Sequence, residues 1–205
     1  MIDLHYSKGE IVGTTPKRAV FLDRDGTINR EAGYVDHPDR FELLPKVGPA
    51  VSRLNQAGLS VVVVSNQSGV GRGLFSLELL NDVDMKMKEL LAWDGANLDG
   101  IYYCPHHPEA KVSEYRKICD CRKPNPGLLQ KASSDLNLDP TRSFMVGDKV
   151  RDLKAGWALG TRSILVLSGY GASELNKIMK NQRDKPDHVA QDLAEAADWI
   201  LDQID

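Results

Sequence analysis

Short apolar runs alternate with segments of helical periodicity along most of the chain. The apolar runs are rich in β-branched and aromatic residues, as buried strands are, and they cover residues 19–22, 59–64, 101–103, 144–146 and 164–167. Between them, apolar residues recur at helix-like spacings over residues 47–56, 77–93, 127–136 and 152–159. This alternation predicts a three-layer, Rossmann-like α/β fold in which helices cover both faces of a parallel sheet.

Polar residues gather where three of the expected strands end. Asp23 and Asp25 follow the first strand, Ser65 and Asn66 follow the second, and Asp148 follows the fourth. Ligands of open parallel sheets bind outside the carboxyl ends of the strands. We therefore expect these side chains to meet at one edge of the sheet and to form the functional site there.

Length and composition favour one packed domain. The chain has 205 residues, 41% of them hydrophobic, which is enough for one domain and few for two. We expect a single domain over residues 18–205, preceded by a polar extension at residues 1–17 and closed by an amphipathic helix at residues 193–204. The polar start lacks the apolar run of a secretory signal, and the net charge of −3 gives no general attraction to nucleic acid or membranes. These features favour a cytoplasmic protein, and we expect a monomer.

The two carboxylates after the first expected strand have the spacing of a catalytic pair. Asp23 could attack a phosphorus atom, while Asp25 donates a proton to the leaving oxygen and later takes one from water. An anionic nucleophile needs positive charge to approach a phosphate, and Mg²⁺ with Asp148 as a further ligand would supply it. Each aspartate alone could instead be a helix cap or a turn residue. The combination of the three favours catalysis.

Phosphoryl transfer also needs hydrogen-bond donors and cations around the phosphate oxygens. The Ser65 hydroxyl, the Asn66 backbone amide and the Lys123 ammonium group are candidates, and Lys149 follows the last of the three aspartates directly. The glycine-rich residues 68–73 are expected to form a flexible basic loop near them. Ser65 and Asn66 could equally form an ordinary turn at a strand end.

All three cysteines lie in one stretch of the chain, together with a histidine. The pattern is Cys104-x-His106 followed by Cys119-x-Cys121, and an odd number of cysteines is a poor basis for a disulfide framework. Four such ligands suit a tetrahedral Zn²⁺. A closed four-ligand site leaves no position for a substrate, so zinc would shape the loop of residues 104–121 and place the two basic residues that follow it. Buried thiols without a metal are the alternative.

Taken in order, these motifs resemble those of the haloacid dehalogenase superfamily. Residues 21–29, Phe-Leu-Asp-Arg-Asp-Gly-Thr-Ile-Asn, look like its first motif, and Ser65, Lys123 and Asp148 look like its second, third and fourth. A narrower resemblance, running from about residue 18 to about residue 166, is to the heptose 1,7-bisphosphate 7-phosphatases and the related histidinol-phosphate phosphatases. Its markers are residues 33–35, 65–69, 102–108, 119–124 and 145–149.

The resemblance implies a role for each candidate residue. Asp23 would be the nucleophile and Asp25 the general acid/base, while Ser65 and Lys123 would steady the transferred phosphoryl group. Mg²⁺ would be held by the Asp23 carboxylate, the Asp25 backbone carbonyl and Asp148, and Zn²⁺ by Cys104, His106, Cys119 and Cys121. The other residues implied to line the substrate pocket are Glu31, Ala32, Gly33, Tyr34, Asn66, Gln67, Ser68, Arg122 and Lys149, with Arg122 at the far end of the substrate.

The activity implied is hydrolysis of the 7-phosphate of a heptose 1,7-bisphosphate through an aspartyl-phosphate intermediate, in the synthesis of nucleotide-activated heptose. No separate cap domain is expected, because neither the first-motif loop nor the region after Ser65 has enough residues to build one. A histidinol-phosphate phosphatase is the first alternative, although Arg122 favours a bisphosphate. An inactive phosphosugar-binding protein is the alternative from another class, and the intact catalytic set opposes it.

Two departures from the family pattern bear on these expectations. Ser65 stands where many relatives carry threonine, which keeps the hydroxyl. Glu31 and Ala32 differ from the more polar pair that the family leads us to expect, and this leaves the choice between the two substrate classes open.

Overall fold

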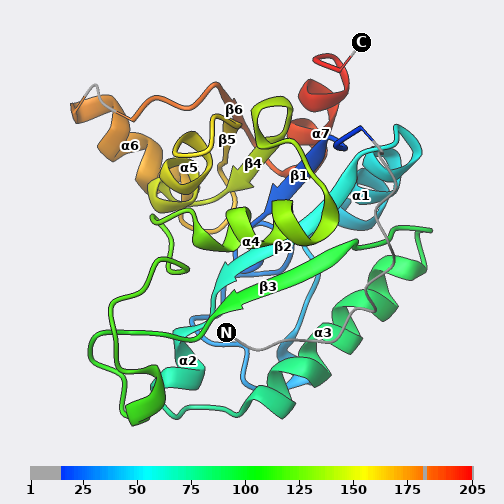
Figure 1. Cartoon of the computed structure of the whole chain (residues 1–205). Helices are drawn as coiled ribbons and strands as arrows, with labels where there is room; N and C mark the ends of the chain where they lie inside the picture. The colour runs from blue at the N-terminus through cyan, green and yellow to red at the C-terminus, as the bar shows by residue number, and fades with distance from the viewer. Residues whose placement is uncertain (1–14, 182–183, 205) are drawn as a thin grey trace.

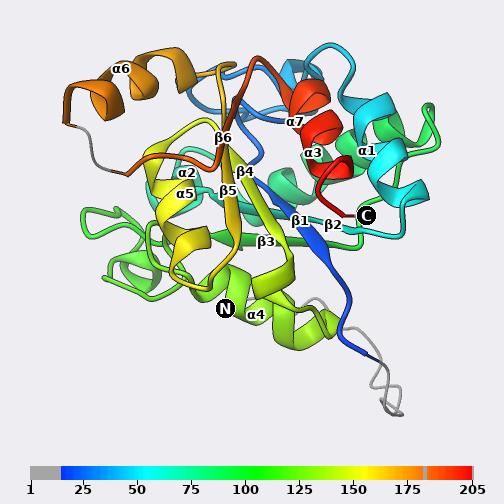
Figure 2. The same cartoon turned by 90° about the horizontal axis from the view of Figure 1, so that it is seen from above.

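The computed structural model describes residues 15–181 and 184–204 of the chain. Within them, six parallel strands form one sheet in the order β3-β2-β1-β4-β5-β6, and helices lie on both of its faces (Figures 1 and 2). The strands are β1 (Ala19–Leu22), β2 (Ser60–Asn66), β3 (Gly100–Cys104), β4 (Phe144–Gly147), β5 (Arg162–Val166) and β6 (His188–Ala190). The helices are α1 (Val47–Gln56), α2 (Ser68–Gly71), α3 (Leu77–Ala92), α4 (Gly127–Leu136), α5 (Val150–Trp157), α6 (Gly171–Asn181) and α7 (Leu193–Leu201), and short 3₁₀ turns cover Pro38–Arg40, Ser113–Tyr115 and Pro140–Arg142.

The burial of the two central strands explains why continuous apolar runs predicted strands in this sequence. β1 is buried over its whole length, and β2 is buried from Ser60 to Ser65. A strand covered by helices on both faces has no solvent-facing side, so its sequence is a continuous apolar run without alternation. The predicted three-layer α/β fold is confirmed.

Helices α1, α3 and α7 cover one face of the sheet, and α4 and α5 cover the other (Figure 2). α1 shows how the sequence achieves this. Val47, Ala50, Val51 and Leu54 recur at intervals of three and four residues, so they share one side of the helix. All four side chains are buried in the core cluster that also contains residues of β1, β2 and α7.

Three local expectations were wrong or incomplete. Residues 68–73 do not form a flexible loop, because α2 is a packed helical turn in which the Arg72 amide donates to the Ser68 carbonyl over 2.9 Å. Gly69 is needed there, since an added Cβ would lie 2.2 Å from the Phe75 ring. Helix α6 and strand β6 were not predicted. β6 is only three residues long and half-buried, so it leaves too weak a pattern to recognise.

The carboxyl ends of β2 and β3 point to the edge of the sheet where α2 and residues 105–126 lie (Figure 1). Among the described residues no cap domain stands apart from the sheet. Most of the expected polar extension, residues 1–14, lies outside the described part of the chain. No helix in the described residues combines the length and the apolar character needed to cross a membrane.

Two neighbouring residues of α1 provide a test of what holds the layers together. Leu54 is fully buried, and we expect Leu54→Ala to lower the free energy of unfolding by about 2–5 kcal/mol, because it leaves a cavity between α1 and the sheet. Arg53 forms an exposed ion pair with Asp198 of α7, and Arg53→Ala should cost less than about 1 kcal/mol. Urea unfolding of both variants measures the difference, and equal losses would contradict this account of the packing.

Candidate active site

Three buried carboxylates meet at the carboxyl ends of β1 and β4. Asp23 follows β1, Asp148 follows β4, and Asp152 lies in the first turn of α5; all three are at most 3% exposed. β1 and β4 are neighbours in register, and the Asp23 amide donates to the Val146 carbonyl over 3.0 Å. One oxygen of each carboxylate lies within 4.8 Å of the others. The topology alone therefore brings together acids that are more than a hundred residues apart.

The ammonium group of Lys123 lies among these carboxylates. Its Nζ is 2.9 Å from Asp23 Oδ1 and 2.7 Å from Asp152 Oδ1, and it donates to the Val64 carbonyl over 2.7 Å. Lys123 is 1% exposed, and a buried cation is tolerated only when it is paired and hydrogen-bonded in this way. The structure thus brings Asp23, Asp148 and Lys123 together, as the sequence predicted, and adds Asp152.

The pKa values of Asp23 and Asp148 are shifted in opposite directions. Burial acts to raise the pKa of Asp23, but the charges of Lys123, Arg151 and Lys149 together outweigh it and hold that pKa at about 2. Burial, and then the charge of Asp23, raise the pKa of Asp148 to about 7. Asp23 is therefore ionised near neutral pH, as a carboxylate nucleophile would need to be, while the negative charge on Asp148 is poorly compensated.

The acid cluster fits a hard divalent cation. Oδ1 of Asp148 is buried and accepts no hydrogen bond from any described residue. Asp23, Asp148 and Asp152 offer closely spaced carboxylate oxygens, which are the ligands that Mg²⁺ prefers. The Asp148 carboxylate packs directly against the backbone of Gly26. Only glycine fits there, because its φ is +90° and an added Cβ would lie 2.3 Å from Asp148 Oδ2.

Asp25 lies beside this cluster, and its carboxylate points to other partners. It accepts hydrogen bonds from the side chains of Arg24, Asn29 and Gln67, with the shortest, from Gln67 Nε2, at 2.7 Å. Its side chain is 18% exposed. The Asp25 carboxylate is therefore a separate, partly accessible acid next to Asp23.

The residues at the end of β2 divide into two groups. Ser65 is 2% exposed, and its hydroxyl accepts a hydrogen bond from Gln67 Nε2 over 3.3 Å. Asn66 instead brackets the backbone of Lys123: its Nδ2 donates to the Lys123 carbonyl and its Oδ1 accepts from the Lys123 amide, each over 3.0 Å. Ser68 begins α2. The side chain of Asn66 thus fixes the lysine segment, a contact that the sequence did not predict.

Glu31, Ala32, Gly33 and Tyr34 form a turn at the rim, in which Glu31 is half-buried and the other three are exposed. Glu31 reaches into the site, where its Oε2 lies 3.1 Å from Lys149 Nζ. Lys149 Nζ also lies 3.4 Å from Asp148 Oδ2 and 4.3 Å from the centre of the Tyr170 ring. Glu31 and Lys149 therefore meet at the acid cluster, while Ala32, Gly33 and Tyr34 remain at the surface.

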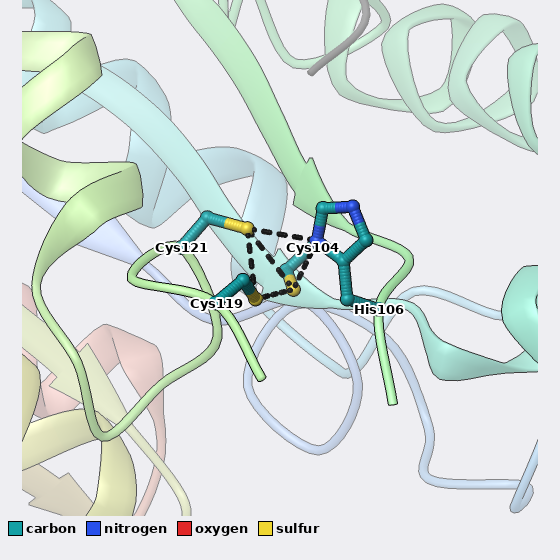
Figure 3. Close-up of side chains that lie close together, drawn as sticks. All are labelled: Cys104, His106, Cys119 and Cys121. Carbon is teal, nitrogen blue, oxygen red and sulfur yellow. Dashed lines mark hydrogen bonds between the residues drawn. The ribbon is translucent and has the colours of Figure 1, made fainter. Parts of the chain in front are cut away.

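Cys104, His106, Cys119 and Cys121 converge on one point, as predicted (Figure 3). The distances between neighbouring ligand atoms run from 3.1 Å, between His106 Nδ1 and Cys121 Sγ, to 3.7 Å, between Cys104 Sγ and His106 Nδ1. A tetrahedral zinc site has ligand–ligand edges of roughly 3.3–3.8 Å, given metal bonds of about 2.0–2.3 Å. A hydrogen bond from Cys104 is the largest influence on Cys121 and helps to lower its pKa to about 5, which favours the thiolate that metals bind. This cluster could hold a metal ion.

A surface cavity of about 380 Å³ lies next to the cysteine cluster, and its lining includes Arg122, Lys123 and His107. Arg122 Nη1 donates to the His106 carbonyl over 3.1 Å. Burial, and then nearby charges that include Arg151 and Arg72, lower the pKa of Arg122. No ion pair between Arg122 and a carboxylate is found in the described residues, so its charge remains available to an anion.

Sequence reasoning missed several residues that surround the site. Asp152 accepts a hydrogen bond from the Lys149 amide over 3.1 Å, which is the pattern of a residue that caps the start of a helix. The sequence therefore contained no sign of its second contact, with Lys123. Arg72 Nη2 lies 2.9 Å from His107 Nε2. Arg24 is a fully buried arginine between the two acids of the first motif. An arginine next to an apolar run was the only available signal for that burial.

Comparison with known proteins agrees with this geometry. A model of the HAD-hydrolase-like family matches residues 120–196. The D-glycero-beta-D-manno-heptose-1,7-bisphosphate 7-phosphatase of Yersinia pestis is 42% identical over 188 residues, which cover 91% of this chain and 90% of the relative. The enzyme of the same name from Escherichia coli K12 is 43% identical over 188 residues, covering 91% and 89%.

Solved structures give the same result. The D,D-heptose 1,7-bisphosphate phosphatase of B. bronchiseptica, complexed with magnesium and phosphate, has a TM-score of 0.79 and 36% identity, covering 91% of this chain and 99% of that one. The corresponding protein of Burkholderia thailandensis has a TM-score of 0.66 and 35% identity, covering 90% and 99%. The acid–lysine cluster, the cysteine cluster and these likenesses agree, and the chain belongs to the D-glycero-beta-D-manno-heptose-1,7-bisphosphate 7-phosphatase family of HAD-like phosphatases.

Proposed function

We propose that this chain hydrolyses the 7-phosphate of D-glycero-D-manno-heptose 1,7-bisphosphate and releases the heptose 1-phosphate. The observation that carries the proposal is the buried cluster of Asp23, Asp148, Asp152 and Lys123 at the strand ends. It occurs in a chain that is 42% identical to a named phosphatase over nine-tenths of its length. The same step supplies a precursor for nucleotide-activated heptose.

In the first half-reaction, a carboxylate oxygen of Asp23 attacks phosphorus. A bond forms from Asp23 to phosphorus, and the bond from phosphorus to the sugar oxygen breaks with its electron pair on that oxygen. Asp25 gives this oxygen a proton, which avoids an alkoxide leaving group. The products are an aspartyl phosphate on Asp23 and the free heptose hydroxyl.

In the second half-reaction, Asp25 removes a proton from water as the water oxygen attacks the aspartyl phosphate. The bond from phosphorus to the Asp23 oxygen breaks, which regenerates the Asp23 carboxylate and leaves inorganic phosphate. Asp25 ends protonated, as it was at the start of the cycle. The two acids therefore divide the roles of nucleophile and proton carrier.

Positive charge from the protein and from a metal ion supports both steps. Lys123 lies 2.9 Å from Asp23 Oδ1, where its charge reaches the equatorial oxygens of a phosphoryl group on that atom, and the Ser65 hydroxyl and the Asn66 amide would add donors. Mg²⁺ would be held by the Asp23 carboxylate, the Asp25 carbonyl and Asp148, and it would supply the charge that lets an anion approach a phosphate. Asp152 would keep Lys123 in place.

Substrate selection would come from the residues at the rim. Arg122, without a carboxylate partner in the described residues, suits the second phosphate of a bisphosphate. Glu31, Gln67, Ser68 and Lys149 would contact the sugar, with Ala32, Gly33 and Tyr34 closing the turn above it. Histidinol phosphate presents an amine in place of the second phosphate, and an amine gains nothing from an arginine.

Zn²⁺ is the metal we propose for the cluster of Cys104, His106, Cys119 and Cys121. Four protein ligands leave no open position, so the ion would be structural. Its role would be to hold the segment that carries Arg122 and Lys123, which follow Cys121 directly.

Removal of the nucleophile is the first test. Asp23→Asn keeps the shape of the side chain but removes the attacking charge, and kcat should fall by on the order of 10⁴-fold or more. Steady-state assays of phosphate release with Mg²⁺ measure this. The exposed Asp39 provides a matched control, since Asp39→Asn should leave kcat unchanged. Substantial turnover by Asp23→Asn would point to a different nucleophile.

Substrate choice is tested with both anomers of the heptose bisphosphate, heptose 7-phosphate and histidinol phosphate. We expect the highest kcat/KM for a bisphosphate. Arg122→Met should lower kcat/KM for the bisphosphate by roughly 10–100-fold, because it removes a charge-assisted contact with the second phosphate. The kcat/KM for heptose 7-phosphate should change little. A preference for histidinol phosphate would reverse the substrate assignment, and no turnover of any phosphate ester would favour a binding protein.

Metal analysis tests the zinc assignment. Protein prepared without chelator should contain about one zinc per chain, and Cys121→Ser should lower both zinc content and melting temperature. The kcat of this variant should fall by roughly 10–100-fold because Lys123 loses its fixed position. A wild-type protein that is free of zinc yet melts and turns over normally would remove the ion from the proposal.

A further inference from the structure

Arg24 is a buried cation that the proposed reaction does not use. It is the largest side chain with no exposed surface in the described part of the chain, and it lies between the proposed nucleophile and the proposed acid/base. Burial of a guanidinium group is costly unless acceptors surround it. The contacts of Arg24 therefore indicate what the rest of the site gains from it.

The guanidinium group of Arg24 holds the carboxylate of Asp25 in a two-point contact. Nη2 donates to Oδ1 over 2.9 Å and to Oδ2 over 3.1 Å, and Nε donates to Oδ1 over 3.2 Å. Asn29 and Gln67 contribute one further donor each, on Oδ1 and Oδ2 respectively. Both oxygens of Asp25 are thus fixed in direction, and the planar fork of Arg24 supplies most of the contacts.

Arg24 is itself held from a distant part of the chain. Its Cζ lies 5.8 Å from the centre of the Tyr103 ring in β3, and the Tyr103 hydroxyl donates to Asp84 in α3. Burial raises the pKa of Asp84 to about 6, although the Tyr103 hydrogen bond and the charge of Arg24 act in the opposite direction. At neutral pH Asp84 is thus mainly ionised, and it balances part of the charge of Arg24.

The first-motif turn does not need this side chain. The backbone carbonyl of Arg24 accepts from the amides of Ile28 and Asn29, over 2.8 and 3.1 Å, and any residue could supply that carbonyl. The side chain donates three hydrogen bonds to Asp25, and its remaining polar contact is with Tyr103, which anchors it. Its particular contribution is therefore to the acid/base.

We propose that Arg24, anchored by Tyr103 and Asp84, is a positioning residue that aims the Asp25 carboxylate for proton transfer in both half-reactions. This inference rests on the proposed function, because it assigns Asp25 the proton carrier's role. Displacement of that carboxylate by about 1 Å is enough to lower the rate strongly when geometry controls catalysis. Arg24 would act on the reaction only through Asp25.

A double-mutant cycle tests whether Arg24 acts through Asp25. Arg24→Met keeps the length of the side chain, and it should lower kcat on an alkyl phosphate by on the order of 100-fold, a large part of a general acid's contribution. In an Asp25→Asn background the same change should cost less than about threefold, since the effects of residues in one network do not add. Steady-state kinetics of the four proteins, with melting temperatures, measure the coupling.

The leaving group gives a second readout that a general loss of packing would not move. p-Nitrophenol leaves without a proton, so the formation of the aspartyl phosphate from p-nitrophenyl phosphate should need Asp25 far less than the same step from an alkyl phosphate. Single-turnover rates of Arg24→Met should therefore fall much less for the aryl ester. Equal losses on both esters would overturn the proposal.

Tyr103→Phe keeps the test decisive if Arg24→Met fails to fold. It removes only the hydroxyl that binds Asp84, and it should reproduce the leaving-group selectivity with a several-fold smaller loss. Tyr102→Phe is the matched control, because Tyr102 packs in the cluster on the opposite face of the sheet and should show no selectivity. A Tyr103→Phe protein that treats both esters as the wild type does would overturn the anchoring role.

The outcomes separate this inference from the function on which it rests. If Asp25→Asn turns over alkyl phosphates as fast as the wild type, the proposed acid/base is wrong and so is the function built on it. If Asp25→Asn has a lower kcat but Arg24→Met has the wild-type kcat, only the role of Arg24 is wrong. The same holds if the kcat loss of the double mutant equals the product of the two single losses, because the residues then act independently.

Discussion

The contact of Lys123 with two buried carboxylates organises the edge of the sheet. Asp23, Asp148 and Asp152 lie too close together to remain ionised without nearby positive charge. Lys123 lies 2.9 and 2.7 Å from Asp23 and Asp152, and removing one member of such a buried pair typically costs about 3–5 kcal/mol. Lys149 also lies 3.4 Å from Asp148 Oδ2, but Oδ1 of Asp148 remains unpaired among the described residues, and a divalent cation bound there would complete the balance.

Two sets of contacts hold the segment of residues 105–126 so that Lys123 reaches the acid cluster. Asn66 brackets the Lys123 backbone from the end of β2, and the cysteine cluster closes the segment two residues earlier (Figure 3). A metal ion in that cluster would affect catalysis without touching a reacting atom, since it would act on the position of Lys123 and Arg122. The site is thus a junction between a rigid sheet edge and a segment with little regular structure of its own.

The two acids of the first motif are only two positions apart in sequence but have opposite surroundings. Asp23 faces Lys123 and the other carboxylates, while Asp25 turns to Arg24, Asn29 and Gln67. In the proposed mechanism, this separation lets one carboxylate remain a charged nucleophile and the other carry a proton. It depends on residues that lie far apart in the chain, since Arg24 is packed against Tyr103 in β3.

The sequence by itself determined the fold class, the edge of the sheet where the candidate site lies, and most of the candidate residues. Strands buried on both faces leave continuous apolar runs, and Asp23, Asp148 and Lys123 each stand in a short local motif that needs no tertiary information. The tertiary structure alone decided the partners of those residues. Asp152 has the local pattern of a helix cap, Arg24 has that of an ordinary charged residue, and residues 68–73 look like a flexible glycine loop. Their surroundings depend on tertiary contacts, with Lys123 for Asp152, Tyr103 for Arg24 and Phe75 for Gly69, and such contacts leave no periodic trace in one sequence.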